Sequence, residues 1–134
     1  MGSKFTVSAV LPASPQEVYD AWLDSKEHSA MTGGTARISA RVGTDFEAWD
    51  GYIQGRNLEL EVGRRIVQSW RTSEFAQDQE DSRVEITLQP TDQGTRLTLV
   101  HSNLPENQKE QYRQGWRDNY FQPMKQYFRR PEQS

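Results

Sequence analysis

Alternating apolar and polar residues run through most of the chain between residues 5 and 102. The first run, Phe5 to Leu11, is closed by Pro12. Turn-forming residues separate six further candidate strands, at residues 36–41, 45–50, 52–62, 65–72, 82–89 and 95–102. Alternation of this kind is typical of an antiparallel sheet with one face on the core and one face in water. The pattern therefore predicts about seven antiparallel strands.

Helical patterns lie on either side of this strand series. Ser14, Pro15 and Glu17 form a capping box with proline at the first helical position, which predicts a short helix up to Trp22. A second short helix is expected at residues 25–31, where Gly33-Gly34 would stop it. A long helix closes the chain after a second candidate capping box at residues 107–110.

The closing helix carries more aromatic side chains than one buried stripe needs. Its large residues are Tyr112, Trp116, Tyr120, Phe121, Met124, Tyr127 and Phe128. At about 100° per residue they cover roughly half the circumference, whereas a helix on one sheet needs a stripe of about 100°. The surplus either lines a cavity or belongs to the core. Pro123 lies inside the pattern and predicts a kink.

This element order favours an α+β fold in which a curved sheet wraps around the C-terminal helix. With 134 residues the chain is most simply one domain, residues 1–134, and is long enough for a substantial core. Residues 73–81 hold several acidic side chains and are expected to form an exposed loop.

Composition narrows the possible functions. The net charge is −3, and Lys and Arg are dispersed, which argues against a nucleic-acid partner. No apolar run approaches the ~18 residues of a membrane span, so a cytoplasmic protein without membrane insertion is expected. The chain has no cysteine, only two histidines, and neither a zinc motif nor a nucleophile elbow. We therefore expect no metal, no cofactor and no enzymatic activity.

Three local patterns resemble a known family. They are residues 11–22, the residues Phe46, Asp50-Gly51 and Gly55 followed by the strand at 65–71, and the helix from Gly115-Trp116 to Phe128. Together they resemble the domain family named after the activator of the Hsp90 ATPase, within the START-like superfamily. The resemblance covers essentially the whole chain and implies the helix-grip fold.

The resemblance also implies a cavity under the long helix, often for a small apolar molecule, but it does not imply one reaction. Eukaryotic activators have two domains, and this chain resembles the C-terminal one, so a full co-chaperone role is not expected. Three functions stay open. They are a binding module for a small hydrophobic or amphipathic ligand, a module that interacts with an Hsp90-type chaperone, and a cyclase- or hydrolase-like enzyme that uses His101, Tyr120 or a buried carboxylate.

Several side chains are candidates for the cavity wall because large side chains with one polar group suit such a site. They are Trp22, Phe46, Trp70, His101, Trp116, Tyr120 and Met124. Arg113 and Arg117 either contact a ligand head group or pair with surface carboxylates such as Glu110. His101 either bonds a ligand or is a satisfied strand-end histidine, whereas His28 lies in a polar helix and is expected to be exposed.

Overall fold

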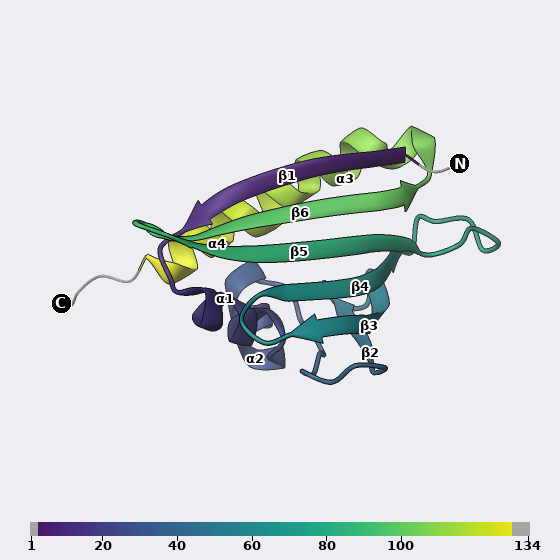
Figure 1. The fold of residues 1–134 in the computed structure, drawn as a ribbon. Helices are drawn as coiled ribbons and strands as arrows, with labels where there is room; N and C mark the ends of the chain where they lie inside the picture. The colour runs from purple at the N-terminus through teal and green to yellow at the C-terminus, as the bar shows by residue number, and fades with distance from the viewer. Residues whose placement is uncertain (1–2, 130–134) are drawn as a thin grey trace.

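A six-stranded antiparallel sheet forms the frame of the molecule (Figure 1). The computed structural model describes residues 3–129. The strands are β1 (Ser3–Leu11), β2 (Asp45–Ala48), β3 (Ile53–Glu61), β4 (Arg65–Thr72), β5 (Ser82–Thr91) and β6 (Gly94–Leu104). Their order across the sheet is β1-β6-β5-β4-β3-β2, so the first two strands form its opposite edges.

Helices α1 (Pro15–Trp22) and α2 (Ser25–Thr32) carry the chain from one sheet edge to the other. The predicted capping box of α1 is confirmed: the Ser14 hydroxyl accepts from the Glu17 N–H, and the Glu17 carboxylate accepts from the Ser14 N–H. The Asp24 carboxylate caps α2 by accepting from the Glu27 N–H, and Gly33 ends it in the left-handed conformation at φ 89°.

The strand expected at residues 36–41 does not form, so the prediction of seven strands is wrong by one. This segment makes a single bridge to β2, between Arg37 and Glu47. Its other edge is held by α2: the Ser29 hydroxyl accepts from the Ala36 N–H at 2.8 Å, and the Ser25 hydroxyl accepts from the Ile38 N–H at 2.9 Å. Serine side chains thus replace the neighbouring strand.

The closing helix lies across one face of the sheet (Figure 1) and has four parts. They are the 3-10 turn η1 (Glu106–Gln108), α3 (Lys109–Gly115), the π-helical segment η2 (Trp116–Phe121) and α4 (Gln122–Phe128). The expected second capping box is wrong, because no side chain caps the start of α3. The irregularity expected at Pro123 is a π-turn just before it, closed by the Gln122 N–H on the Arg117 carbonyl.

The π-turn explains the wide aromatic arc seen in the sequence. One extra residue in a helical turn sets the following segment back by about 100° relative to a continuous α-helix. Both Tyr120 and Phe121 are consequently buried, and Met124 and Phe128 return to the inner face. Tyr127, at the edge of the corrected arc, is half-buried. The surplus of aromatic positions therefore reflects helix geometry, and does not by itself indicate a cavity.

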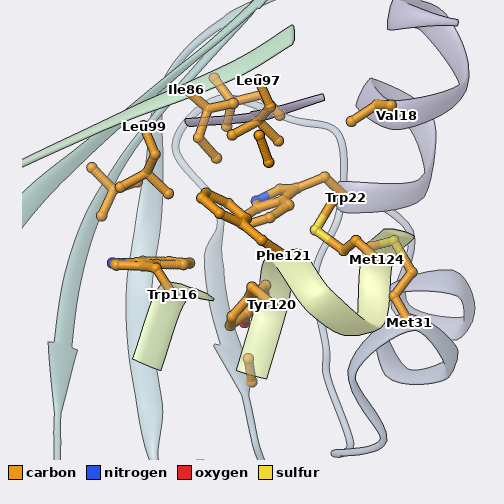
Figure 2. Close-up of a cluster of buried hydrophobic side chains, with 14 of the residues drawn as sticks. Val18, Trp22, Met31, Ile86, Leu97, Leu99, Trp116, Tyr120, Phe121 and Met124 are labelled. Atoms are coloured by element: carbon orange, nitrogen blue, oxygen red, sulfur yellow. The ribbon is translucent and has the colours of Figure 1, made fainter. Parts of the chain in front are cut away.

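The core fills the space between the sheet and the helices (Figure 2). Aliphatic side chains of β5 and β6 meet Trp22 from α1, Met31 from α2 and large residues of the closing helix. Met124 is fully buried in this core. Phe46 covers Gly55 on the neighbouring strand, where a Cβ atom would lie 1.9 Å from the Ser69 carbonyl oxygen, so only glycine fits there.

Candidate functional site

A pocket of about 380 Å³ opens between the closing helix and the β3–β4 end of the sheet. The helix contributes Gln111, Tyr112, Gly115, Trp116, Asn119 and Tyr120 to its wall. The sheet and its β2–β3 turn contribute Trp49, Tyr52, Ile53 and Trp70. The volume falls at the lower end of the range of small-molecule sites, about 300–1,000 Å³.

Gly115 lies in the helical wall without any packing reason to be glycine. Its φ is −60°, an ordinary helical value. Apart from its own turn of helix, a Cβ atom there would meet only the Asn119 amide nitrogen at 3.7 Å, which is normal van der Waals contact. Glycine costs a helix interior about 0.5–1 kcal/mol relative to alanine. The helix thus carries a destabilising residue at a position whose visible effect is to leave space in the pocket.

A buried histidine fixes the ring of Trp116. The indole N–H of Trp116 donates to His101 Nδ1 at 2.9 Å. His101 Nε2 lies 2.8 Å from the Ser82 hydroxyl, which itself donates to the Trp70 carbonyl at 2.7 Å, so Nε2 carries the proton. Burial lowers the pKa of His101 to about 3. A proton on Nδ1 would also point at the Trp116 indole N–H, so that two donors would face each other. His101 is therefore a neutral, satisfied histidine behind the pocket wall.

The second histidine holds Tyr120 in the same manner, so the expectation that His28 is exposed is wrong. Only 2% of His28 is exposed. Its Nδ1 donates to the Trp22 carbonyl at 2.8 Å, and its Nε2 accepts from the Tyr120 hydroxyl at 3.0 Å. Burial lowers the pKa of His28 and raises that of Tyr120. The polar neighbours in sequence concealed a helix face that packs on the closing helix.

Hydrogen bonds also fix the rings at the pocket mouth. The Tyr112 hydroxyl donates to Gln108 Oε1 at 2.6 Å and lies 2.6 Å from the Thr72 hydroxyl. The Tyr52 hydroxyl donates to the Glu74 carboxylate, which holds the pKa of Glu74 below its usual value. These bonds make the phenol rings a rigid wall.

The loop at residues 73–81 is exposed, as expected, except at Phe75 and Gln79. Phe75 is buried, with its ring 6.2 Å from that of Trp70 and 5.9 Å from that of Tyr112. Arg71 holds the loop by donating to the carbonyl oxygens of Ala76 and Gln79. The loop thereby supports the pocket from behind, a role that its acidic composition did not reveal.

The structure brings three of the predicted cavity residues together, since Trp70, Trp116 and Tyr120 line the pocket. The other four lie outside its wall. Trp22 is buried beneath it, with its ring 6.1 Å from that of Trp116, and Met124 and His101 are core residues. Phe46 contacts Gly55 on the inner face of the sheet.

Neither predicted head-group residue lines the pocket. Arg113 lies 3.6 Å from Glu110 in an ion pair along the helix, as the surface-pair alternative expected. Its Nε is buried and makes no hydrogen bond within residues 3–129. Arg117 is exposed on the outer side of the π-turn. Among the residues that do line the pocket, none is charged.

The remaining wall residues were missed for different reasons. Tyr112 was recognised as part of the aromatic arc but was not assigned to a site. Trp49 falls within the strand expected at residues 45–50, whereas it occupies the turn between β2 and β3. Gly115 entered the sequence analysis only as part of the Gly115-Trp116 pattern of the closing helix. Asn119 gave no signal, because a polar residue on a long helix is ordinarily exposed.

The pocket has the volume of a small-molecule site, but its wall offers few reactive groups. Hydrogen bonds from Tyr52 and Arg65 lower the pKa values of Glu74 and Glu85, respectively, so both carboxylates remain ionised. Within residues 3–129, no cluster of histidine and acidic side chains is arranged to hold a metal ion. None of the helices in that range combines the length and apolar character needed to cross a membrane.

Comparison with curated proteins identifies relatives that are named as activators of a heat shock protein ATPase. The chain is 31% identical over 127 residues to the human protein named activator of 90 kDa heat shock protein ATPase homolog 1, covering 93% of this chain and 37% of the relative. It is 29% identical over 116 residues to the Dictyostelium discoideum homolog, covering 86% of this chain and 30% of the relative. The chain thus spans about a third of the length of these relatives.

Solved structures show the same fold. An HSP90 activator from Plasmodium falciparum matches with a TM-score of 0.83 at 21% identity, covering 92% of this chain and 94% of that one. CalU16 from Micromonospora echinospora matches with a TM-score of 0.80 at 25% identity, covering 98% of this chain and 79% of that one. The family model for Activator of Hsp90 ATPase homolog 1-like proteins matches residues 12–129. With most of its length matched by that model, this chain belongs to the family of Activator of Hsp90 ATPase homolog 1-like proteins.

Proposed function

We propose that this chain is a non-enzymatic binding module whose pocket takes a small hydrophobic or amphipathic molecule. The observation that carries the proposal is Gly115, which leaves open space beside a wall of aromatic rings. If Gly115 served only the fold, alanine would make the helix more stable at this position, because a Cβ atom has room there.

The rigidity of the wall supports the same proposal. Trp116 and Tyr120 are each held by a buried histidine, and Tyr112 is held through Thr72 and Gln108. A site whose rings are fixed before binding loses little side-chain entropy when a ligand enters. The aromatic network thus favours recognition of a ligand by a preformed shape.

Isothermal titration calorimetry with 2-naphthol tests this function. This probe is neutral at pH 7, mainly apolar, and carries one hydroxyl group. Unmodified protein is expected to bind one equivalent. The Gly115→Leu variant should lose at least tenfold in affinity, because its side chain would occupy the space that Gly115 leaves open.

Gln126→Leu is the matched control, since Gln126 is exposed on the same helix and does not line the pocket. It should bind the probe as the unmodified protein does, and circular dichroism should show that both variants are folded. Absence of binding to unmodified protein, or equal binding by Gly115→Leu, would contradict the proposal.

A second candidate is interaction with an Hsp90-type chaperone, which the names of the curated relatives favour. Those relatives are about three times as long as the matched segment, so activity of the whole protein does not transfer automatically. If the candidate is correct, adding this chain should raise the ATPase rate of the chaperone from the same organism. Unchanged rates together with no retention on the immobilised chaperone would eliminate it.

A further inference from the structure

The turn between β2 and β3 holds two consecutive residues other than glycine in a backbone conformation that favours glycine or asparagine. Trp49 has φ 54° and Asp50 has φ 59°, and the Gly51 N–H donates to the Ala48 carbonyl at 3.2 Å. Because β2 and β3 pair Ala48 with Ile53, the loop between them has four residues, and Gly51 follows in the same left-handed region at φ 92°. A bulky tryptophan at positive φ is a rare and costly choice. The turn therefore retains Trp49 despite its backbone preference.

The indole of Trp49 lies at the pocket and has a restricted position. A Cβ atom at Gly34 would come within 2.5 Å of the Trp49 ring, so the ring rests directly on the backbone there. Trp49 is half-buried and lines the pocket with Trp116 and Tyr120. Within residues 3–129 its ring does not stack on the rings of Trp70, Trp116 and Tyr120, but its side chain interacts with that of Tyr120. Because the indole is half-buried and lines the pocket, a ligand there can contact it.

The chemistry of the wall limits which ligand can do so. Tryptophan and tyrosine rings prefer flat aromatic partners, through offset stacking or edge-to-face contact. No lysine or arginine lines the pocket, so a carboxylate or phosphate would be desolvated without a cationic partner. Asn119 adds a solvent-exposed amide group to the wall. That amide could pair with one hydroxyl or carbonyl group of the ligand.

We propose that Trp49 is the specificity-determining residue of the pocket and selects a neutral, flat aromatic molecule with one hydrogen-bonding group. This inference rests on the proposed function, because it names the ligand class of the same site. It explains why the hairpin retains tryptophan at a left-handed position next to a glycine that makes room for its ring.

Asparagine substitutions at two neighbouring positions distinguish the effect of the Trp49 indole on binding from the effect of the turn's backbone conformation. Trp49→Asn removes the ring and places a residue suited to positive φ in the turn. Asp50→Asn makes the equivalent backbone change, keeps an oxygen that can accept from the Thr35 N–H, and leaves the indole in place. Trp49→Asn is expected to bind 2-naphthol at least tenfold more weakly, whereas Asp50→Asn should stay within twofold of the unmodified protein. Thermal unfolding should show that both variants are folded.

A matched set of three probes tests the ligand class. 2-Naphthol is neutral and flat, 2-naphthoate adds a negative charge, and decahydro-2-naphthol has the same carbon skeleton without aromaticity. We expect the naphthoate and the saturated alcohol each to bind at least tenfold more weakly than 2-naphthol. Equal affinity of either one would overturn the inference.

The outcomes distinguish this inference from the function on which it rests. If the unmodified protein binds none of the probes, or Gly115→Leu binds as well as it does, the binding function fails and the inference fails with it. If Gly115→Leu loses affinity while Trp49→Asn does not, the pocket is a binding site but Trp49 does not select its ligand.

Discussion

Both histidines of the chain are buried hydrogen-bond acceptors for side chains of the pocket wall. His101 accepts from the Trp116 indole, and His28 accepts from the Tyr120 hydroxyl. Each must be neutral to do so, and burial lowers the pKa of both rings. The same two contacts therefore orient the site and tie the stability of the fold to pH.

Replacing His101 with glutamine should reduce the acid sensitivity of the protein. The pKa of His101 is about 3 in the fold, against about 6.5 in the unfolded chain, so its stabilising effect is complete above pH 6.5 and declines as the pH falls toward 3. At about 1.4 kcal/mol per pH unit, the loss from this residue between pH 7 and 5 is about 2 kcal/mol. Urea unfolding at both pH values measures this loss of unfolding free energy. A loss in His101→Gln equal to that in the unmodified protein would contradict this role.

Met124 provides a test of core against pocket. It is fully buried and does not line the pocket, so Met124→Ala should lower the free energy of unfolding by about 2–5 kcal/mol. The affinity of the folded variant for 2-naphthol should remain within a factor of about two. A small loss of stability with a large change in affinity would instead place Met124 at the ligand.

The closing helix shows how far element-level reasoning from the sequence extends. Its existence and its buried residues followed from the spacing of Tyr112, Trp116 and Phe128. Its π-turn did not follow from the sequence, because a periodicity of 3.6 residues assumes a regular helix. On that assumption the extra residue of the π-turn makes the buried arc look wider than it is. The short strand beside β2 was also overestimated, because alternation cannot show that serine hydroxyls of α2 satisfy its backbone.

Two glycines in different elements should respond oppositely to alanine. Gly115→Ala should raise the free energy of unfolding by about 0.5–1 kcal/mol, because its Cβ has room in an ordinary helix. Gly55→Ala should lower it by about 1–3 kcal/mol or more, because its Cβ would meet backbone and the Phe46 ring. Chemical denaturation of both variants measures the difference. A destabilised Gly115→Ala would show that this glycine serves the fold.

At the scale of the whole molecule, the α+β class, the antiparallel sheet and the C-terminal helix were predictable from patterning and resemblance. The position of the pocket could be predicted only in part. Trp70, Trp116 and Tyr120 were predicted and lie in its wall. Trp49 and Asn119 were not, because they come from a turn and from a polar helix position that meet only in three dimensions. Local patterning reports which face is buried, whereas a pocket depends on the spacing between faces.

The four tryptophans allow the most direct test of a ligand in this pocket. Each has one indole N–H, which gives one assignable signal in a heteronuclear NMR spectrum of protein labelled with ¹⁵N. Trp49, Trp70 and Trp116 line the pocket, whereas Trp22 is buried beneath it and donates to Gln68 at 3.4 Å. Titration with 2-naphthol is expected to shift the first three signals with one common affinity and to move that of Trp22 least. Unchanged spectra at saturating probe, or shifts confined to Trp22, would contradict a binding site between the closing helix and the sheet.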